Sequence, residues 1–182
     1  MEYEIKIHYD YNDSLKDLWN NFEKKSFNHC FQNFYWLENW YKNLKDKEAL
    51  IICTLLVTKN NQLSYIFPFC LEKKFGIRLL KWQGGLQADY MNGLFFSTTD
   101  IGKIDFLNLW KKIKEKLPKF DLVYLEKQPE KIGQLENPFV KYLSKIQQSY
   151  SSSIVSEDTF DEFLEKNLKK KFLDDTKRSL KN

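Results

Sequence analysis

The order of apolar and polar residues predicts a strand followed by two helices at the start of the chain. Residues 2–8 alternate between apolar and charged or polar side chains, which is the period of a β-strand. The capping residues Asn12-Asp13-Ser14 then precede apolar residues at helical spacing over residues 15–22. The same spacing returns over residues 34–44. We therefore expect two amphipathic helices after the first strand.

Three strands are predicted in the middle of the chain. Residues 49–58 and 63–71 are nearly continuous apolar runs, and residues 75–82 follow as a third. Asn60-Asn61 lies between the first two runs, and asparagine tolerates the positive φ angles of a tight hairpin. Because the links are short, we expect neighbouring strands to be antiparallel.

The second half of the chain mixes shorter elements. Residues 83–93 contain three glycines and predict a loop, and Pro118 ends a helix predicted from the apolar spacing over residues 106–117. Two further strands are expected at residues 94–96 and 120–126. Irregular structure is expected at residues 128–138, and an extended segment at residues 146–155.

The last part of the chain predicts a basic helix. Thr159 and Glu162 have the spacing of a capping box, and lysines dominate the residues that follow. Neither a glycine cap nor a proline closes this helix before Asn182. We therefore expect a domain at residues 1–158 and a basic helix at residues 159–182 that leads into a further domain.

Composition and charge narrow the class of protein. Hydrophobic residues make up 42% and aromatic residues 16% of the 182 residues, which is typical of a folded domain. The net charge is +4, but only Arg78 and Arg178 are arginines. Arginine is the preferred residue for phosphate and base contacts, so no nucleic-acid partner is expected. Tryptophans at helical spacing, Trp36 and Trp40 among them, are expected in the core rather than as a base-stacking surface.

Cysteine and histidine usage argues against a metal site and against disulfides. Cys30, Cys53 and Cys70 are an odd number at long spacings, which favours a reducing, cytoplasmic location. His8 and His29 have no ligand partner at helical spacing, so no metal is expected. No apolar run reaches the ~20 residues that span a bilayer, and neither a membrane span nor a signal peptide is expected.

The glycine loop is the most informative segment for function. Gly84 and Gly85 follow a predicted strand, but no Gly-Lys-Ser or Gly-Lys-Thr follows, as a phosphate-binding loop requires. A tight turn with positive φ is the favoured interpretation. The same loop holds a carboxylate, a phenol and an amide within four residues, at Asp89, Tyr90 and Asn92. Such groups can recognise a hydroxylated substrate, although turns also favour Asp and Asn.

An ordered set of motifs resembles the CelD-like acyltransferases of the GNAT superfamily, which are related to FemAB-type transferases. The resemblance covers nearly the whole chain, and its information lies in the order of the pieces. They are Phe31-Gln32 with Trp36-Leu37 and Trp40, Ile66-Phe67-Pro68-Phe69, Leu79-Leu80-Lys81-Trp82-Gln83-Gly84 leading to Asp89-Tyr90, Asp121-Leu122-Val123, Gln128-Pro129, Asn137-Pro138-Phe139, and residues 160–180.

The resemblance implies an α/β (α+β) fold with a mixed, largely antiparallel sheet flanked by helices, as one half of a tandem GNAT chain. It implies acyl transfer from acetyl-CoA or another acyl-CoA to an amine or hydroxyl of a small-molecule or saccharide acceptor, in polysaccharide or cell-envelope biosynthesis. Leu86 stands where the acyl-CoA pyrophosphate turn needs glycine, so no catalytic residue is carried over. The acyl-CoA site is expected in a C-terminal GNAT domain.

The residues expected to contact the acceptor are Gln83, Asp89, Tyr90 and Asn92. Two other function classes stay open at this stage. One is a non-enzymatic interaction module without a catalytic half. The other is an RNA-associated protein that uses the lysine-rich terminal helix, whose affinity would fall steeply with salt.

Overall fold

The structure is a computed structural model that describes residues 3–45, 49–96 and 101–144, and the single positions 159, 162 and 166. It divides into two units, Met1–Lys145 and Ile146–Asn182. In the second unit, the Thr159 backbone N–H donates to Glu162 Oε2 at 2.9 Å, and the Glu162 backbone N–H donates to Thr159 Oγ1 at 3.4 Å. This pair confirms the predicted capping box. The predicted extended segment at 146–155 and most of the basic helix lie outside the described residues.

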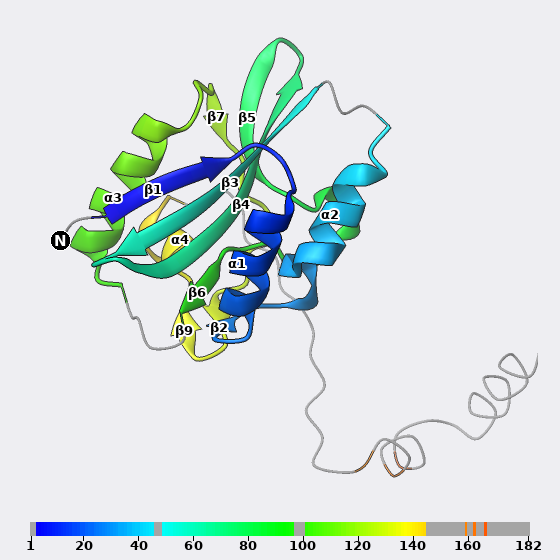
Figure 1. The fold of residues 1–182 in the computed structure, drawn as a ribbon, viewed down its shortest axis with the longest axis vertical. Coiled ribbons are helices and arrows are strands. Elements are labelled where there is room, and N and C mark those ends of the chain that lie inside the picture. Colours follow the sequence, from blue (N-terminus) through cyan, green and yellow to red (C-terminus); the bar gives the residue numbers. More distant parts are fainter. Residues whose placement is uncertain are drawn as a thin grey trace, which may run out of the picture. The chain divides into compact units, whose positions relative to one another are not determined.

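The first unit is built on a mostly antiparallel sheet (Figure 1). Its strands in spatial order are β1 (Tyr3–His8), β3 (Leu50–Lys59), β4 (Gln62–Lys74), β5 (Ile77–Trp82) and β7 (Leu122–Val123). Among the described strands, only the pairing of β5 with β7 is parallel. The short strand β6 (Leu94–Phe96) also pairs with β4 and carries β2 (Ser26–Phe27) on its other edge.

Helices lie on both faces of the sheet (Figure 1). One face packs against α1 (Asp13–Glu23) and α2 (Phe34–Lys42). The other packs against α3 (Lys103–Lys116) and the short α4 (Pro138–Tyr142). The remaining short elements are η1 (Cys30–Gln32), η2 (Gly85–Gln87), and the hairpin β8 (Lys131–Ile132) and β9 (Leu135–Glu136). The predicted mixed α/β class with a mostly antiparallel sheet is confirmed.

Burial on both faces explains why the central strands read as continuous apolar runs. In β3, Leu55 and Val57 face the core under α3, while Leu56 packs in the core under α1 and α2. In β4, Phe67 and Ile66 divide between the two faces in the same way. A strand buried on both faces loses the apolar–polar alternation of a half-exposed strand.

Two tight turns connect the central strands. Asn60 and Asn61 have φ angles of 50° and 61°, which confirms the predicted asparagine hairpin between β3 and β4. Phe75 and Gly76, at 51° and 82°, form the corresponding turn between β4 and β5. The third strand was predicted to begin at Phe75, but Phe75 is part of the turn.

Two other predicted boundaries differ in the structure. The strand predicted at 120–126 is only Leu122–Val123, because its pairing is limited to Leu79 and Leu80 of β5. The segment predicted to be irregular, 128–138, holds the β8–β9 hairpin and the start of α4. Asn137 caps α4 by accepting from the Phe139 N–H at 3.1 Å, with Pro138 at the first helical position. Within the described ranges, no helix has the length and apolar character needed to cross a bilayer.

Candidate functional site

The loop at residues 83–93 arises because two strands share one edge of β4. Phe69 to Lys74 of β4 pair with β5, while Tyr65 and Ile66 pair with β6. The chain leaves this edge after Trp82 and returns to it at Leu94. Phe67 and Pro68 lie at the gap between the two pairings. The loop is therefore anchored to the middle of the sheet at both of its ends.

Proline suits the gap in the edge of β4. The Gln83 N–H donates to the Pro68 carbonyl at 2.8 Å, so this carbonyl points toward the gap. In an antiparallel strand, the N–H and C=O of one residue point to the same side. Proline has no N–H, so it leaves no donor unsatisfied where neither β5 nor β6 pairs.

The glycines of the loop permit close packing on α2. Gly84 and Gly85 have φ angles of 115° and 56°, which confirms the tight-turn interpretation. A Cβ on Gly84 would lie 3.3 Å from a Trp36 ring carbon, and a Cβ on Gly85 would lie 3.1 Å from Trp40 Nε1. The loop thus covers one side of the Trp36 and Trp40 rings, which are half-buried rather than fully in the core as predicted.

Lys127 holds the outer part of the loop. Its ammonium donates to the Ala88 carbonyl at 2.7 Å and to the Leu86 carbonyl at 3.1 Å. Its own carbonyl accepts from the Met91 N–H at 2.9 Å. Lys127 follows β7, so the segments after β5 and after β7 meet.

Because β5 and β7 pair in parallel, the carboxyl ends of both strands lie at the same end of the sheet. In open α/β sheets, ligands bind outside the carboxyl ends of parallel strands, where the connecting loops diverge. Two loops follow these strands at that end of the sheet, residues 83–93 after β5 and residues 124–130 after β7. We call the region where these two loops meet the loop site.

Gln83, predicted as an acceptor contact, is buried in the loop site's floor. Gln83 is only 3% exposed. Its Nε2 donates to Thr54 Oγ1 at 3.0 Å and to the Phe69 carbonyl at 2.8 Å, and its Oε1 accepts from the Tyr11 hydroxyl. Burial is the main reason that the pKa of Tyr11 is well above its ordinary value. Both amide hydrogens of Gln83 are therefore used inside the protein.

Asn92 is also internal. It is 1% exposed, and its Nδ2 donates to the Gly93 carbonyl. Gly93 has no room for a side chain, because a Cβ there would lie 2.4 Å from Phe67 Cδ1. Asn92 and Gly93 therefore belong to the return of the loop to β4.

Asp89 and Tyr90 are the two predicted residues that reach the surface. Asp89 is exposed and Tyr90 is half-buried. The Tyr90 ring stacks on His29, with ring centroids 5.0 Å apart and planes at 24°. The Tyr90 carbonyl accepts from Gln32 Nε2 at 2.8 Å. The structure thus brings the loop next to η1. Of the four predicted residues, Asp89 is exposed, Tyr90 is half-buried, and Gln83 and Asn92 are buried.

Sequence reasoning missed His29, Gln32 and Lys127 as parts of this site. Gln32 stands in the Phe31-Gln32 motif, so a signal existed, but its partner Tyr90 is 58 residues away. Lys127 had no signal, because its contacts depend on the short parallel pairing of β5 with β7.

The electrostatics of the site favour a neutral imidazole. Burial lowers the pKa of His29, and its Nε2 is buried without a partner among the described residues. Among the described residues, no three His, Cys, Asp or Glu side chains converge as a metal site would need.

The three cysteines differ in exposure. Cys30 is exposed, whereas Cys53 and Cys70 are buried. Burial raises the pKa of the Cys53 thiol to about 12.

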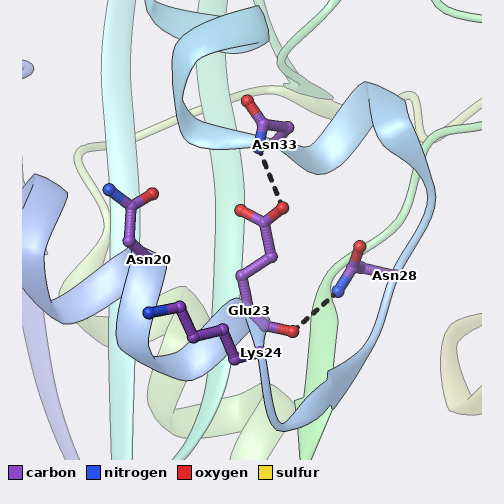
Figure 2. Close-up of a pocket in the computed structure, with 5 residues that line it drawn as sticks. All are labelled: Asn20, Glu23, Lys24, Asn28 and Asn33. Carbon is purple, nitrogen blue, oxygen red and sulfur yellow. Dashed lines mark hydrogen bonds between the residues drawn. The ribbon is translucent and has the colours of Figure 1, made fainter.

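A second feature is a polar hollow of about 410 Å³ (Figure 2). It lies beside the end of α1, between this helix and the segment that leads to α2. Its lining residues are polar or charged: Asn20, Glu23, Lys24, Asn28 and Asn33. None of them belongs to the loop site.

No protein-family model, no curated protein and no solved structure matches this chain.

Replacement of Gln83 by leucine is expected to lower the free energy of unfolding by about 2–4 kcal/mol. The change removes the partner of the buried Thr54 and Tyr11 hydroxyls and one bond to the Phe69 carbonyl, and an unsatisfied buried group costs about 1–3 kcal/mol. Chemical denaturation measures the loss. The control is Gln87→Leu in the exposed part of the loop, which should stay within about 0.5 kcal/mol of wild type. Equal stability of the two variants would contradict the structural role of Gln83.

Acidification is expected to destabilise the fold through His8 and His29. Burial is the main cause that lowers both pKa values below the ordinary 6.5. As the pH falls through about 6.5, the unfolded chain takes up protons that the folded chain does not, so the free energy of unfolding falls. The loss continues down to the lowered folded-state pKa values. Denaturation curves from about pH 7.5 to 5.5 should show a smaller slope in a His8→Gln, His29→Gln double variant. An identical slope would refute this assignment.

Proposed function

We propose that this chain is the acceptor-side portion of a GNAT-type acyltransferase that transfers an acyl group from acyl-CoA to an amine or hydroxyl. The proposal extends the resemblance given by the sequence motifs, with polysaccharide or cell-envelope biosynthesis as the setting. One observation supports it: the segment after β5, which holds the exposed Asp89 and the half-buried Tyr90, meets the segment after the parallel strand β7 through Lys127. In open α/β sheets, ligands bind outside the carboxyl ends of parallel strands, and among the described strands β5 and β7 are the pair with that arrangement.

Each predicted residue has a role in this proposal. Asp89 supplies an exposed carboxylate that accepts hydrogen bonds from an acceptor hydroxyl or ammonium. Tyr90 and His29 form a stacked pair beside it. Gln83 and Asn92 support the loop from inside rather than touch the acceptor. Holding the acceptor in place is the main contribution required, because acyl transfer depends on positioning the nucleophile against the thioester.

The loop itself does not fit the pyrophosphate of acyl-CoA. A pyrophosphate cradle needs backbone amides at the start of a helix, whereas Gly84 and Gly85 lead into the three-residue turn η2. The chain then enters β6 rather than a helix. The proposal therefore places acyl-CoA binding on another part of the protein, in a further GNAT domain, and derives no step from this loop toward the cofactor.

A second candidate function is a non-enzymatic interaction module. The observation in its favour is the apolar tip of the β4–β5 turn, where Phe75 is 93% and Ile77 is 42% exposed. Neighbouring exposed apolar side chains are typical of protein contact surfaces. Titration calorimetry of the full-length protein with acetyl-CoA separates the two classes. Binding of acetyl-CoA would contradict a simple interaction module.

Replacement of Asp89 by asparagine is expected to raise the KM for the acceptor about tenfold, with a smaller effect on kcat. A hydrogen bond to a charged group contributes about 1.5–3 kcal/mol, and only the acceptor contacts this carboxylate. The assay follows the transfer of labelled acetyl groups from acetyl-CoA to D-glucosamine, other amino sugars and neutral sugars by the full-length protein. The matched control is Glu115→Gln, which removes an exposed carboxylate on α3.

Two results would count against the proposal. The first is an absence of acyl transfer to every acceptor tested. The second is an acceptor KM that stays unchanged in Asp89→Asn while the enzyme remains active, which would remove the acceptor role from the loop site.

A further inference from the structure

The turn between β4 and β5 has a bulky aromatic residue where the backbone favours a small or polar one. Lys74 pairs with Ile77, so Phe75 and Gly76 form a two-residue turn, with φ angles of 51° and 82°. Such turns favour asparagine, aspartate or glycine, because the Cβ of other residues is crowded at positive φ. The β3–β4 turn follows this preference with asparagine at both positions. Phe75 is therefore unfavourable for the turn itself.

Phe75 does not compensate for this strain by packing in the core. It is 93% exposed, and the Lys74 ammonium lies 5.6 Å from the centroid of its ring. Figure 1 shows the turn of this hairpin projecting past the ends of α2 and α3. A strained residue that adds no core packing indicates a role outside the folding of the chain.

Other apolar side chains are exposed at the same end of the sheet. Ile77 directly follows the turn. Ile51 pairs with Leu71 of β4, and Leu122 pairs with Leu79 of β5, so both lie beside the base of the hairpin. Ile77, Ile51 and Leu122 are all exposed. We call residues 73–78 together with Ile51 and Leu122 the hairpin end, and such a group of exposed apolar side chains is typical of a contact surface.

Positive charge surrounds the apolar side chains of the hairpin end. Lys73, Lys74 and Arg78 are exposed, and none of them forms an ion pair with a described residue. The nearest acid on β4, Glu72, is already in an ion pair at 2.8 Å. Asp121 accepts from the Arg78 backbone N–H at 2.7 Å. Three cations against this one carboxylate leave the hairpin end positive.

A small hollow of about 120 Å³ at the hairpin end combines the two characters. It is lined by Ala49, Ile51, Leu71, Lys73 and Arg78. Lys73 and Arg78 are directly opposite each other on β4 and β5. Arginine and lysine are the residues that bind phosphate groups. Apolar side chains beside two such cations are complementary to a phosphate that carries an apolar chain.

We infer that the hairpin end binds the surface of an anionic lipid bilayer, with Phe75 inserted at the boundary between headgroups and acyl chains. Aromatic side chains favour that boundary, and neighbouring lysines and arginines bind anionic headgroups. Such a contact is peripheral and needs no membrane-spanning helix. The hairpin end lies at the opposite end of β5 from the loop site, and the inference stands whether or not the chain acts in acyl transfer.

Other partners of matching charge fit the hairpin end less well. Single-stranded RNA is bound by several stacked aromatic rings together with arginines, whereas the hairpin end has one ring, Phe75, and one arginine, Arg78. An acidic protein needs a concave surface shaped to the projecting turn. A bilayer needs no such shape, because lipids rearrange around a protruding side chain. The aliphatic neighbours of Phe75 also suit acyl chains.

The test is flotation of the full chain with vesicles of phosphatidylcholine, either pure or mixed with about 30% phosphatidylglycerol. We expect the chain to float with the mixed vesicles and at most weakly with pure phosphatidylcholine. Raising the salt concentration should weaken the binding, because salt screens the attraction between the cations and the headgroups.

Phe75→Asn is the decisive variant, because it gives the turn the residue type found between β3 and β4. It should weaken vesicle binding about tenfold, since the inserted ring is lost. Its Tm should equal or exceed that of the wild type, because asparagine tolerates positive φ. Phe75→Trp keeps an interfacial ring and should bind as the wild type does. The matched control is Ile104→Asn, which removes a 77% exposed side chain on α3 and should leave binding unchanged.

A Lys73→Gln, Lys74→Gln double variant tests the electrostatic part independently. It should weaken binding to the mixed vesicles about tenfold or more, because each lysine near an anionic surface adds to the attraction. It also keeps the inference testable if Phe75→Asn does not fold, since unchanged binding in the double variant would then overturn it.

Four outcomes would overturn the inference. The first two are an absence of flotation with the mixed vesicles and equal binding to pure phosphatidylcholine. The third is unchanged binding in a folded Phe75→Asn variant, which would assign any membrane contact to other residues, such as the basic residues 169–181. The fourth is binding of poly-uridylate or poly-glutamate that depends on Phe75 while vesicles are not bound, which would indicate an RNA or a protein partner.

Discussion

The arrangement of the first unit depends on how one edge of β4 is divided between two strands, while its other edge pairs with β3. β5 and β6 both pair with the divided edge, and the backbone between them must leave the sheet and return. Pro68 tolerates the gap because it has no N–H to satisfy there, and Gln83 closes it with backbone and side-chain hydrogen bonds. The loop at 83–93 is thus part of the sheet's hydrogen-bonding scheme rather than a free excursion.

This constraint decides which side chains the loop site can offer. The residues at the two ends of the loop, Gln83 and Asn92, are buried and connect the loop to the core. The residues near its middle, Asp89 and Tyr90, are left at the surface, and η1 supports Tyr90 through His29 and Gln32. A rigidly held loop with exposed functional groups is the arrangement by which scaffolds commonly position binding residues.

Local signals allowed much of the fold to be predicted from the sequence. Asn60-Asn61 and the loop glycines act through their own φ angles, and Asn12, Asn33 and Thr159 act within a helical turn, so their effects are visible in short stretches. The internal role of Gln83 was not visible, because its partners Tyr11 and Thr54 are 72 and 29 residues away. The polar hollow also escaped prediction, because its lining residues come from α1, from the segment after α1 and from the cap of α2, and they form no motif in the sequence.

The central claim is that the loop is anchored to the sheet at its roots, and amide hydrogen exchange of the individual residues tests it most directly. The Gln83 and Met91 amides donate to the carbonyls of Pro68 and Lys127. We predict that both exchange within about tenfold of the amides in the β3–β4 ladder, because they open only with the core. Exchange of both at the rate of unprotected amides, while the β3–β4 ladder stays protected, would contradict the account.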